Sequence, residues 1–139
     1  MRYWDSSALV ALLVEEPTSA ARRTLLRQDP RIVTWWGSWI ECASALNRLQ
    51  REGGLDQHDL HQALTRLEQL AAAWLEIRPL EQVRRRALRL LRIHPLRGAD
   101  ALQLAAALSA AAEDTASLEF VSSDTRLSAV AHLEGFRVR

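Results

Sequence analysis

Apolar residues recur along the chain in short strand-like runs that alternate with longer stretches at helical spacing. Cys42, Leu46 and Leu49 repeat at helical spacing, and the pair Gly53-Gly54 predicts the end of that helix. The same analysis predicts strands over 3–4, 31–34, 74–78, 118–122 and 136–138. It predicts helices over 8–14, 17–28, 38–51, 56–71, 80–91, 99–112 and 125–133.

Strands that alternate with helices predict a parallel sheet covered on both faces, a three-layer α/β/α domain. A chain of 139 residues with 48% apolar residues is long enough for one such domain with a real core. No apolar stretch is long enough to cross a bilayer, and the first residues do not resemble a signal peptide. The single cysteine, Cys42, excludes an intrachain disulfide, which fits a reducing cytoplasm.

The charge and the types of basic residue limit the classes of function that the protein can have. The formal net charge is only +1, so the whole molecule is not a polycation. All 18 basic residues are arginine and none is lysine. Arginine binds phosphate in a bidentate geometry, whereas any site that needs a lysine is excluded.

Four acidic residues at the ends of separate segments carry the candidate chemistry: Asp5, Glu41, Asp100 and Asp124. In an open α/β sheet, sites are built where strands end and helices begin. Carboxylates gathered there repel one another, and a hard cation such as Mg²⁺ or Mn²⁺ relieves that repulsion. A cation held in this way can activate water against a phosphodiester.

Each acid alone has a simpler explanation. Asp5 and Asp124 have the positions of helix N-caps, and Asp100 lies in the first turn of a helix, where any acid is favoured. Glu41 lies beside the buried stripe of its helix, where an acid needs a partner, and Arg48 is either that partner or a phosphate contact. Four acids at matching ends of four segments favour a shared site.

Four runs occur in a fixed order along the chain and carry a family resemblance. They are Asp5-Ser-Ser-Ala-Leu-Val-Ala-Leu, the helix opening at Glu41, Gly98-Ala-Asp100-Ala-Leu-Gln-Leu-Ala-Ala-Ala, and Val121-Ser-Ser-Asp124-Thr-Arg-Leu-Ser-Ala-Val-Ala with Gly135-Phe-Arg-Val. Over essentially its whole length the chain resembles a PIN domain of the VapC toxin type. The resemblance implies one PIN domain over 1–139.

The resemblance also implies an activity and partners. We expect a Mg²⁺- or Mn²⁺-dependent endoribonuclease, the toxin of a toxin–antitoxin pair, with a VapB-like antitoxin and a homodimeric state. We expect Asp5 and Asp100 to contact the metal directly, and Glu41 and Asp124 to act through water or at a second metal. Gln103 departs from the pattern, because such toxins often carry histidine there.

Basic residues outside the acidic set are candidate RNA contacts. Arg85, Arg89 and Arg92 lie on one stripe of the helix that Leu80 to Leu91 mark and that is predicted to end before His94-Pro95, opposite its apolar face. This stripe is either a solvated face or a surface for RNA phosphates. A second, weaker candidate surface consists of Arg22, Arg23 and Arg27.

Three tryptophans precede Glu41: Trp35, Trp36 and Trp39. One or two of them should belong to the core. The remainder predicts a partly exposed aromatic patch suited to an antitoxin.

Two other functions stay open. Receiver domains and haloacid-dehalogenase phosphatases also place an aspartate after the first strand, but both need a lysine in the site, which this chain lacks. A PIN-like module that binds without catalysis is the other alternative. The complete acidic set disfavours it, because a binding module has no need to gather carboxylates.

Overall fold

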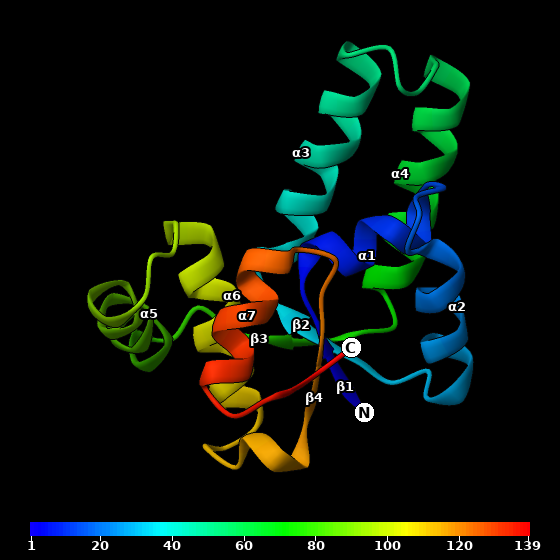
Figure 1. The fold of residues 1–139 in the computed structure, drawn as a ribbon. Helices are drawn as coiled ribbons and strands as arrows, with labels where there is room; N and C mark the ends of the chain where they lie inside the picture. Colours follow the sequence, from blue (N-terminus) through cyan, green and yellow to red (C-terminus); the bar gives the residue numbers. More distant parts are fainter.

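The computed structural model describes all residues 1–139 and contains a five-stranded parallel sheet that separates two layers of helices (Figure 1). The strands are β1 (Arg2–Trp4), β2 (Ile32–Trp35), β3 (Leu75–Ile77), β4 (Glu119–Val121) and β5 (Arg137–Val138). The helices are α1 (Ser6–Leu13), α2 (Ser19–Gln28), α3 (Ser38–Arg51), α4 (Gln57–Ala71), α5 (Glu81–Ile93), α6 (Gly98–Ala110), the 3₁₀ turn η1 (Thr115–Ser117) and α7 (Thr125–Leu133).

The sheet has the strand order β3-β2-β1-β4-β5, and every neighbouring pair is parallel. β1 lies at the centre, where Tyr3 is in register with Val33 of β2 and Phe120 of β4. The chain therefore adds β2 and β3 on one side of β1 and then returns to add β4 and β5 on the other side. In doubly wound folds, sites lie outside the carboxyl ends of the strands at such a switch point.

Alternation along β1 divides the core into two halves. Tyr3 packs with Phe120 and the buried residues of α5, α6 and α7. Trp4, one residue on, points to the other face and packs with α1, α3 and α4. Both side chains are fully buried. The predicted three-layer α/β/α architecture is confirmed.

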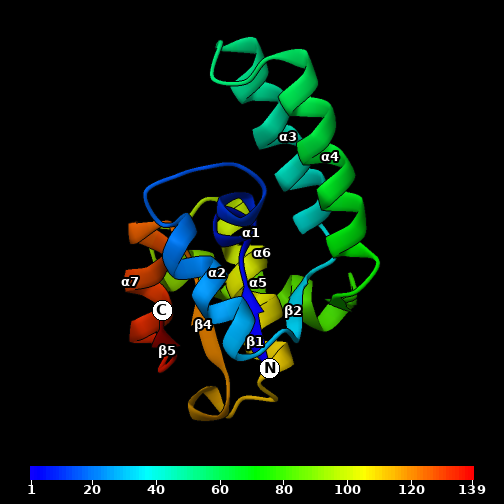
Figure 2. The ribbon, with the colours of Figure 1, turned by 90° about the vertical axis from the view of Figure 1, so that its right-hand side faces the viewer.

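Helices α3 and α4 form an antiparallel hairpin that projects beyond the α/β body (Figures 1 and 2). Gly53 ends α3 in a left-handed conformation with φ +81°, and Gly54 N–H donates to the Leu49 carbonyl at 2.8 Å. The predicted stop at this glycine pair is correct. The hairpin places the start of α3, with Glu41, at the same edge of the sheet as the start of α1.

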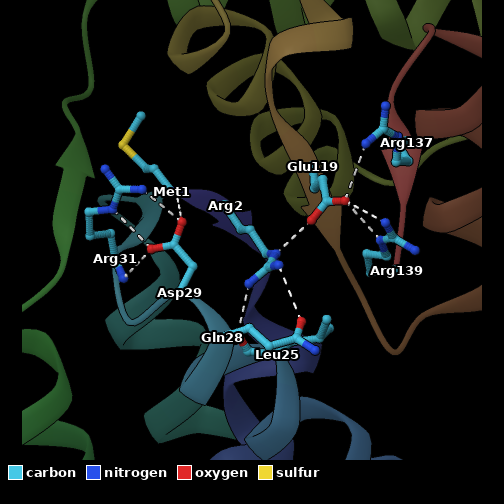
Figure 3. A network of polar contacts seen from close by, with 9 residues as sticks. All are labelled: Met1, Arg2, Leu25, Gln28, Asp29, Arg31, Glu119, Arg137 and Arg139. Carbon is cyan, nitrogen blue, oxygen red and sulfur yellow. Dashed lines mark hydrogen bonds and ion pairs between the residues drawn. The ribbon is translucent and has the colours of Figure 1, made fainter.

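An arginine network fastens the opposite edge of the sheet, where the strands begin (Figure 3). Arg2 donates to Glu119 at 2.6 Å, and Arg139 donates to the same carboxylate at 2.6 Å. These hydrogen bonds, of which the one from Arg2 has the largest effect, lower the pKa of Glu119 to about 2. The N-terminal amine of Met1 and the guanidinium of Arg31 likewise both form ion pairs with the Asp29 carboxylate. Arg2 and Glu119, at the starts of β1 and β4, are thus tied together at the edge away from the acidic residues, and Arg139, which follows β5, reaches back to the same carboxylate.

Several sequence-based boundaries need small corrections. Helix α1 begins two residues earlier than predicted because Asp5 caps it, and α2 begins at Ser19 because Pro17 and Thr18 form a turn. The turn η1 was not predicted. Cys42 is buried as expected, and burial raises the pKa of its thiol. None of the helices combines the length and apolar character that a membrane crossing requires.

Candidate active site

Four helices begin at the carboxyl edge of the sheet, and each brings one of the four acidic residues with it. Glu41 lies in the first turn of α3 and Asp100 in the first turn of α6, while Asp5 and Asp124 are the N-caps of α1 and α7. The positive ends of four helix dipoles therefore face one region. Glu41, Asp100 and Asp124 line a single cleft of about 560 Å³ there. The other lining residues are Ser6, Ser7, Val10, Ile40, Ser44, Ala45, Arg48, Arg97, Ala99 and Arg126.

Asp5 is not itself part of the cleft lining: it is only 2% exposed and is hydrogen-bonded to Ser7, which lines the cleft. Its carboxylate accepts hydrogen bonds from the Ser7 hydroxyl at 2.8 Å, the Ala8 amide at 3.0 Å and the Ser122 hydroxyl at 3.1 Å. Burial raises the pKa of Asp5 to about 6, the hydrogen bonds oppose that rise, and the charge of Asp124 adds to it. Asp5 is thus a helix cap whose carboxyl group holds its proton more tightly than an exposed aspartate does.

Asp124 closes the cleft from the β4–α7 turn. Its side chain accepts from the Arg126 and Leu127 amides at 2.8 and 3.0 Å, the geometry of an N-cap. The Ser122 hydroxyl, which donates to Asp5, also accepts from the Asp124 amide at 3.0 Å. One serine therefore joins two of the four acids.

Glu41 is held by two groups that sequence reasoning did not assign to the site. The Ser6 hydroxyl donates to it at 2.7 Å and the Gln103 amide at 3.2 Å. Gln103 is buried, accepts from the Tyr3 hydroxyl at 2.7 Å and donates to the Ser38 hydroxyl at 2.9 Å. Burial raises the pKa of Glu41, and Asp100 contributes to that rise. The helical spacing from Asp100 to Gln103 was the available signal for this contact.

Asp100 lines the same cleft as Glu41 and is half-buried. Burial raises its pKa, and the charge of Asp124 adds to the rise, whereas Arg97 and Arg126 lower it. Asp100 thus interacts electrostatically with both other acids of the cleft. The sequence-based expectation that the four acids gather at the carboxyl edge of the sheet agrees with where the structure places them.

Three arginines line the cleft around these acids: Arg48 on α3, Arg97 at the start of α6 and Arg126 on α7. None of their guanidinium groups forms an ion pair within 4.0 Å, so all three can bind an incoming anion. Arg97 and Arg126 were not predicted, although each lies within three residues of a predicted acid, because the sequence does not show which way their side chains point.

The other basic residues have a different placement. Arg85, Arg89 and Arg92 are exposed on α5 and do not line the cleft. Arg22 is buried, so the predicted surface of Arg22, Arg23 and Arg27 is wrong for its first member. Its guanidinium donates inward to the β4–α7 turn that carries Asp124.

The acidic residues fit a hydrated hard cation better than a fully caged one. No three acidic, histidine or cysteine side chains approach closely enough to form a compact metal-binding cluster. The donors are nevertheless carboxylate and hydroxyl oxygens, which Mg²⁺ and Mn²⁺ prefer. Mg²⁺ usually keeps several waters and uses only one or two carboxylates of the protein. The donor set fits such an ion.

The tryptophans beside the cleft divide between core and surface. Trp35 is buried, while Trp36 and Trp39 are 49% and 43% exposed. Trp39 packs edge-on against Trp74, and the neighbouring Ile40 is 64% exposed. A partly exposed apolar patch of Trp36, Trp39 and Ile40 therefore lies at the start of α3, as the sequence predicted for one or two of the tryptophans.

The chain is similar to known proteins over its length. The PIN domain family model matches residues 2–133. Two relatives from Mycobacterium tuberculosis, named Ribonuclease VapC45 and Ribonuclease VapC49, are each 34% identical, with 98% of this chain and 92% of theirs aligned.

Solved structures share the fold. Mycobacterium tuberculosis VapC20, described as a sarcin–ricin loop cleaving toxin, superposes with a TM-score of 0.68 at 17% identity, over 98% of this chain and 96% of that one. A toxin–antitoxin complex from Klebsiella pneumoniae gives a TM-score of 0.66 at 16% identity, over 91% of this chain and 88% of that one. At these identities the likeness concerns the fold.

Proposed function

The chain belongs to the PIN domain family, and we propose that it is a divalent-metal-dependent endoribonuclease of the VapC type, the toxin of a toxin–antitoxin pair. The observation that carries the proposal is the meeting of Asp5, Glu41, Asp100 and Asp124 where four helices begin. The similarity to two proteins named ribonuclease supports it. A receiver-type phosphohydrolase is disfavoured by the strand order and by the lack of lysine.

We assign Asp5 and Asp100 to direct contact with Mg²⁺ or Mn²⁺, and Glu41 and Asp124 to its bound waters or to a second ion. When bound, the cation polarises the scissile phosphate and lowers the pKa of its water. Ser7 and Ser122 hold Asp5 in place, and Ser6 and Gln103 hold Glu41. These hydroxyl and amide groups fix the carboxylates before the substrate arrives, which lowers the cost of reorganisation.

The substrate enters as an anion, and the arginines of the cleft suit its backbone. Arg48 lies on α3, Arg97 directly precedes α6 and Arg126 lies on α7. We propose that they bind RNA phosphates on both sides of the scissile bond. Arg85, Arg89 and Arg92 lie outside the cleft, and their role as a further phosphate surface stays a prediction. Their replacement by glutamine should reduce the salt dependence of RNA binding if they contact the backbone.

The proposal is tested by cleavage of a mixed-sequence RNA with Mg²⁺, with Mn²⁺ and with chelator. Asp5→Asn should abolish cleavage, and chelator should do the same to the native chain. Asp56→Asn is the matched control, because Asp56 is also a helix N-cap but lies at the hairpin tip. If Asp5→Asn cleaves RNA as fast as the native chain, the proposed active site is wrong.

We further propose that an antitoxin and a second copy of the chain are partners, and that the protein acts on RNA in the cytoplasm. The patch of Trp36, Trp39 and Ile40 is our candidate antitoxin surface, because exposed aromatics are favoured at interfaces. A basic antitoxin side chain could then enter the acidic cleft from this patch.

Both partners can be tested with purified protein. Trp36→Ala should weaken binding of the product of the adjacent open reading frame, whereas Leu133→Ala, at an even more exposed apolar site on α7, should not. Light scattering at micromolar concentration tests the dimer. A monomer under these conditions would contradict the second part of the proposal.

A further inference from the structure

A second hollow of about 330 Å³ adjoins the acidic cleft and shares five lining residues with it: Ser7, Val10, Ala45, Arg48 and Asp124. Val10, Ala45 and Leu49 give it an apolar wall. Its polar wall comes from Ser123 and from Glu16 in the α1–α2 loop. A flat ligand with a polar edge, seated next to the reacting phosphate, would suit this combination.

Glu16 is the most informative residue of the hollow. It is half-buried, and its carboxylate has neither a hydrogen bond nor an ion pair. Glu15 beside it is exposed and pairs with Arg23 at 3.0 Å. Burial raises the pKa of Glu16, as expected for a carboxylate without a donor.

The backbone of Glu16 is held firmly. Its amide donates to the Ser19 hydroxyl at 2.8 Å, and the Ser19 amide donates back to the Glu16 carbonyl at 3.0 Å. Ser19 is itself fully buried and donates to the Val14 carbonyl. The loop therefore presents a free carboxylate to the hollow from a fixed position.

We propose that this hollow binds a guanine base of the RNA next to the scissile phosphate, with the Glu16 carboxylate accepting hydrogen bonds from the base. The proposal rests on the ribonuclease function proposed above. The aliphatic wall would cover one face of the ring, and the Arg48 guanidinium, shared with the cleft, lies where it can stack on the base or bind its phosphate.

Guanine follows from the donors that each base offers. An ionised carboxylate only accepts hydrogen bonds, through two oxygens side by side. Guanine presents two adjacent donors, N1–H and the N2 amino group. Adenine and cytosine offer one amino group next to a ring-nitrogen acceptor, and the single donor of uracil lies between two carbonyl oxygens. Only guanine matches a carboxylate without placing an acceptor against it.

Cleavage-site mapping on a mixed-sequence RNA tests the proposal. The native chain should cut beside guanine, and Glu16→Gln should lose about 10- to 100-fold of that preference because one acceptor becomes a donor. Glu15→Gln is the matched control and should keep both rate and preference. A Glu16→Gln variant with unchanged preference and rate would overturn the guanine pocket while leaving the ribonuclease function intact.

A binding measurement separates the pocket from the activity. Guanosine 5′-monophosphate should bind about tenfold more tightly than inosine 5′-monophosphate, which lacks the N2 amino group, when both are titrated by NMR. Glu16→Gln should remove the difference, and Glu15→Gln should not. Equal binding of the two nucleotides would overturn the pocket. If nucleotide binding behaves as expected and no RNA is cleaved, the ribonuclease proposal fails and the pocket stands.

Discussion

Arg22 donates from its guanidinium to the main-chain carbonyl of Ser122 at 2.5 Å, across 100 residues of sequence. The side chain also donates to the Ser123 hydroxyl at 3.2 Å and is buried without a carboxylate within ion-pair distance. Burying a charge in this way is costly unless its hydrogen bonds are used. The contact holds the β4–α7 turn in place. In this turn the Ser122 hydroxyl donates to Asp5, and Asp124 follows two residues later.

Replacing Arg22 by methionine should therefore loosen the β4–α7 turn. We expect the loss of roughly 2 kcal/mol in the free energy of unfolding, because both hydrogen bonds from a charged donor disappear while the stem is retained. Arg23→Met is the matched control, since Arg23 is exposed and pairs only with Glu15. Thermal melts of both variants in chelator measure the difference.

Arg22 should also affect the site beyond its effect on stability. Arg22→Met should bind Mn²⁺ more weakly in the absence of RNA, since Asp5 and Asp124 lose a common support, and Arg22→Lys should recover part of that affinity. If Arg22→Met is less stable but binds Mn²⁺ as tightly as the native chain, Arg22 supports the fold alone.

Asp5 gives the metal-free protein a pH-dependent stability. Burial raises its pKa from an ordinary value of 3.8 to about 6, so the folded state binds the proton more tightly. The free energy of unfolding should therefore fall as the pH rises from about 4 to about 6, by at most about 3 kcal/mol. Asp5→Asn, which cannot ionise, should be the more stable protein at pH 7 in chelator and nearly equal at pH 4.

Adding Mg²⁺ should reverse that order. The native chain gains stability by mass action when the cation binds, whereas Asp5→Asn should gain little. Denaturant titrations at pH 4, 5, 6 and 7, with chelator and with Mg²⁺, give all the required values. A native chain whose metal-free stability does not change between pH 4 and pH 6 would contradict the burial of an ionisable Asp5.

Gln103 connects Glu41 in the site with Tyr3 and Ser38 in the core, and its loss should affect both the site and the core. In Gln103→Met the Tyr3 hydroxyl loses its acceptor, and Ser38 and Glu41 lose a donor, and both Tyr3 and Ser38 are fully buried. We expect a loss of about 2–4 kcal/mol in the free energy of unfolding. Gln62→Met on the exposed side of α4 is the control and should be neutral in a thermal melt. Equal stability of the two variants would refute the role given to this network.

The sequence predicted the layers, the number of strands and the four acids because each depends on local signals. Short apolar runs marked the strands that end before Asp5 and Asp124, and capping chemistry marked these two residues themselves. Arg22 could not be found in this way, since a surface arginine and a buried one look alike until the turn at Ser122 is packed against it.

Contacts made only by the fold were likewise beyond local reasoning. Arg97 and Arg126 come to the cleft from helices separated in sequence, and Glu16 becomes part of a hollow only when α3 packs beside α1. Arg48 was foreseen, because its helical spacing from Glu41 puts both on nearly the same side of α3.

Arg48 offers the most direct test of how RNA is held. It lines both the acidic cleft and the neighbouring hollow, and it has no ion-pair partner. Arg48→Ala should weaken RNA binding by about tenfold at low salt and reduce the slope of log affinity against log salt by roughly one, since one phosphate contact is lost.

Arg51 supplies the control, because it is exposed three residues further along α3 and lines neither cavity. Binding is measured with Asp5→Asn as the background, so that RNA is not consumed, over a range of salt concentrations. Arg51→Ala should keep the native slope. If both substitutions lower the slope equally, RNA follows the projecting α3–α4 hairpin rather than the cleft. If neither does, the phosphates are held by Arg97 and Arg126, and the α3 wall of the cleft serves only to position Glu41.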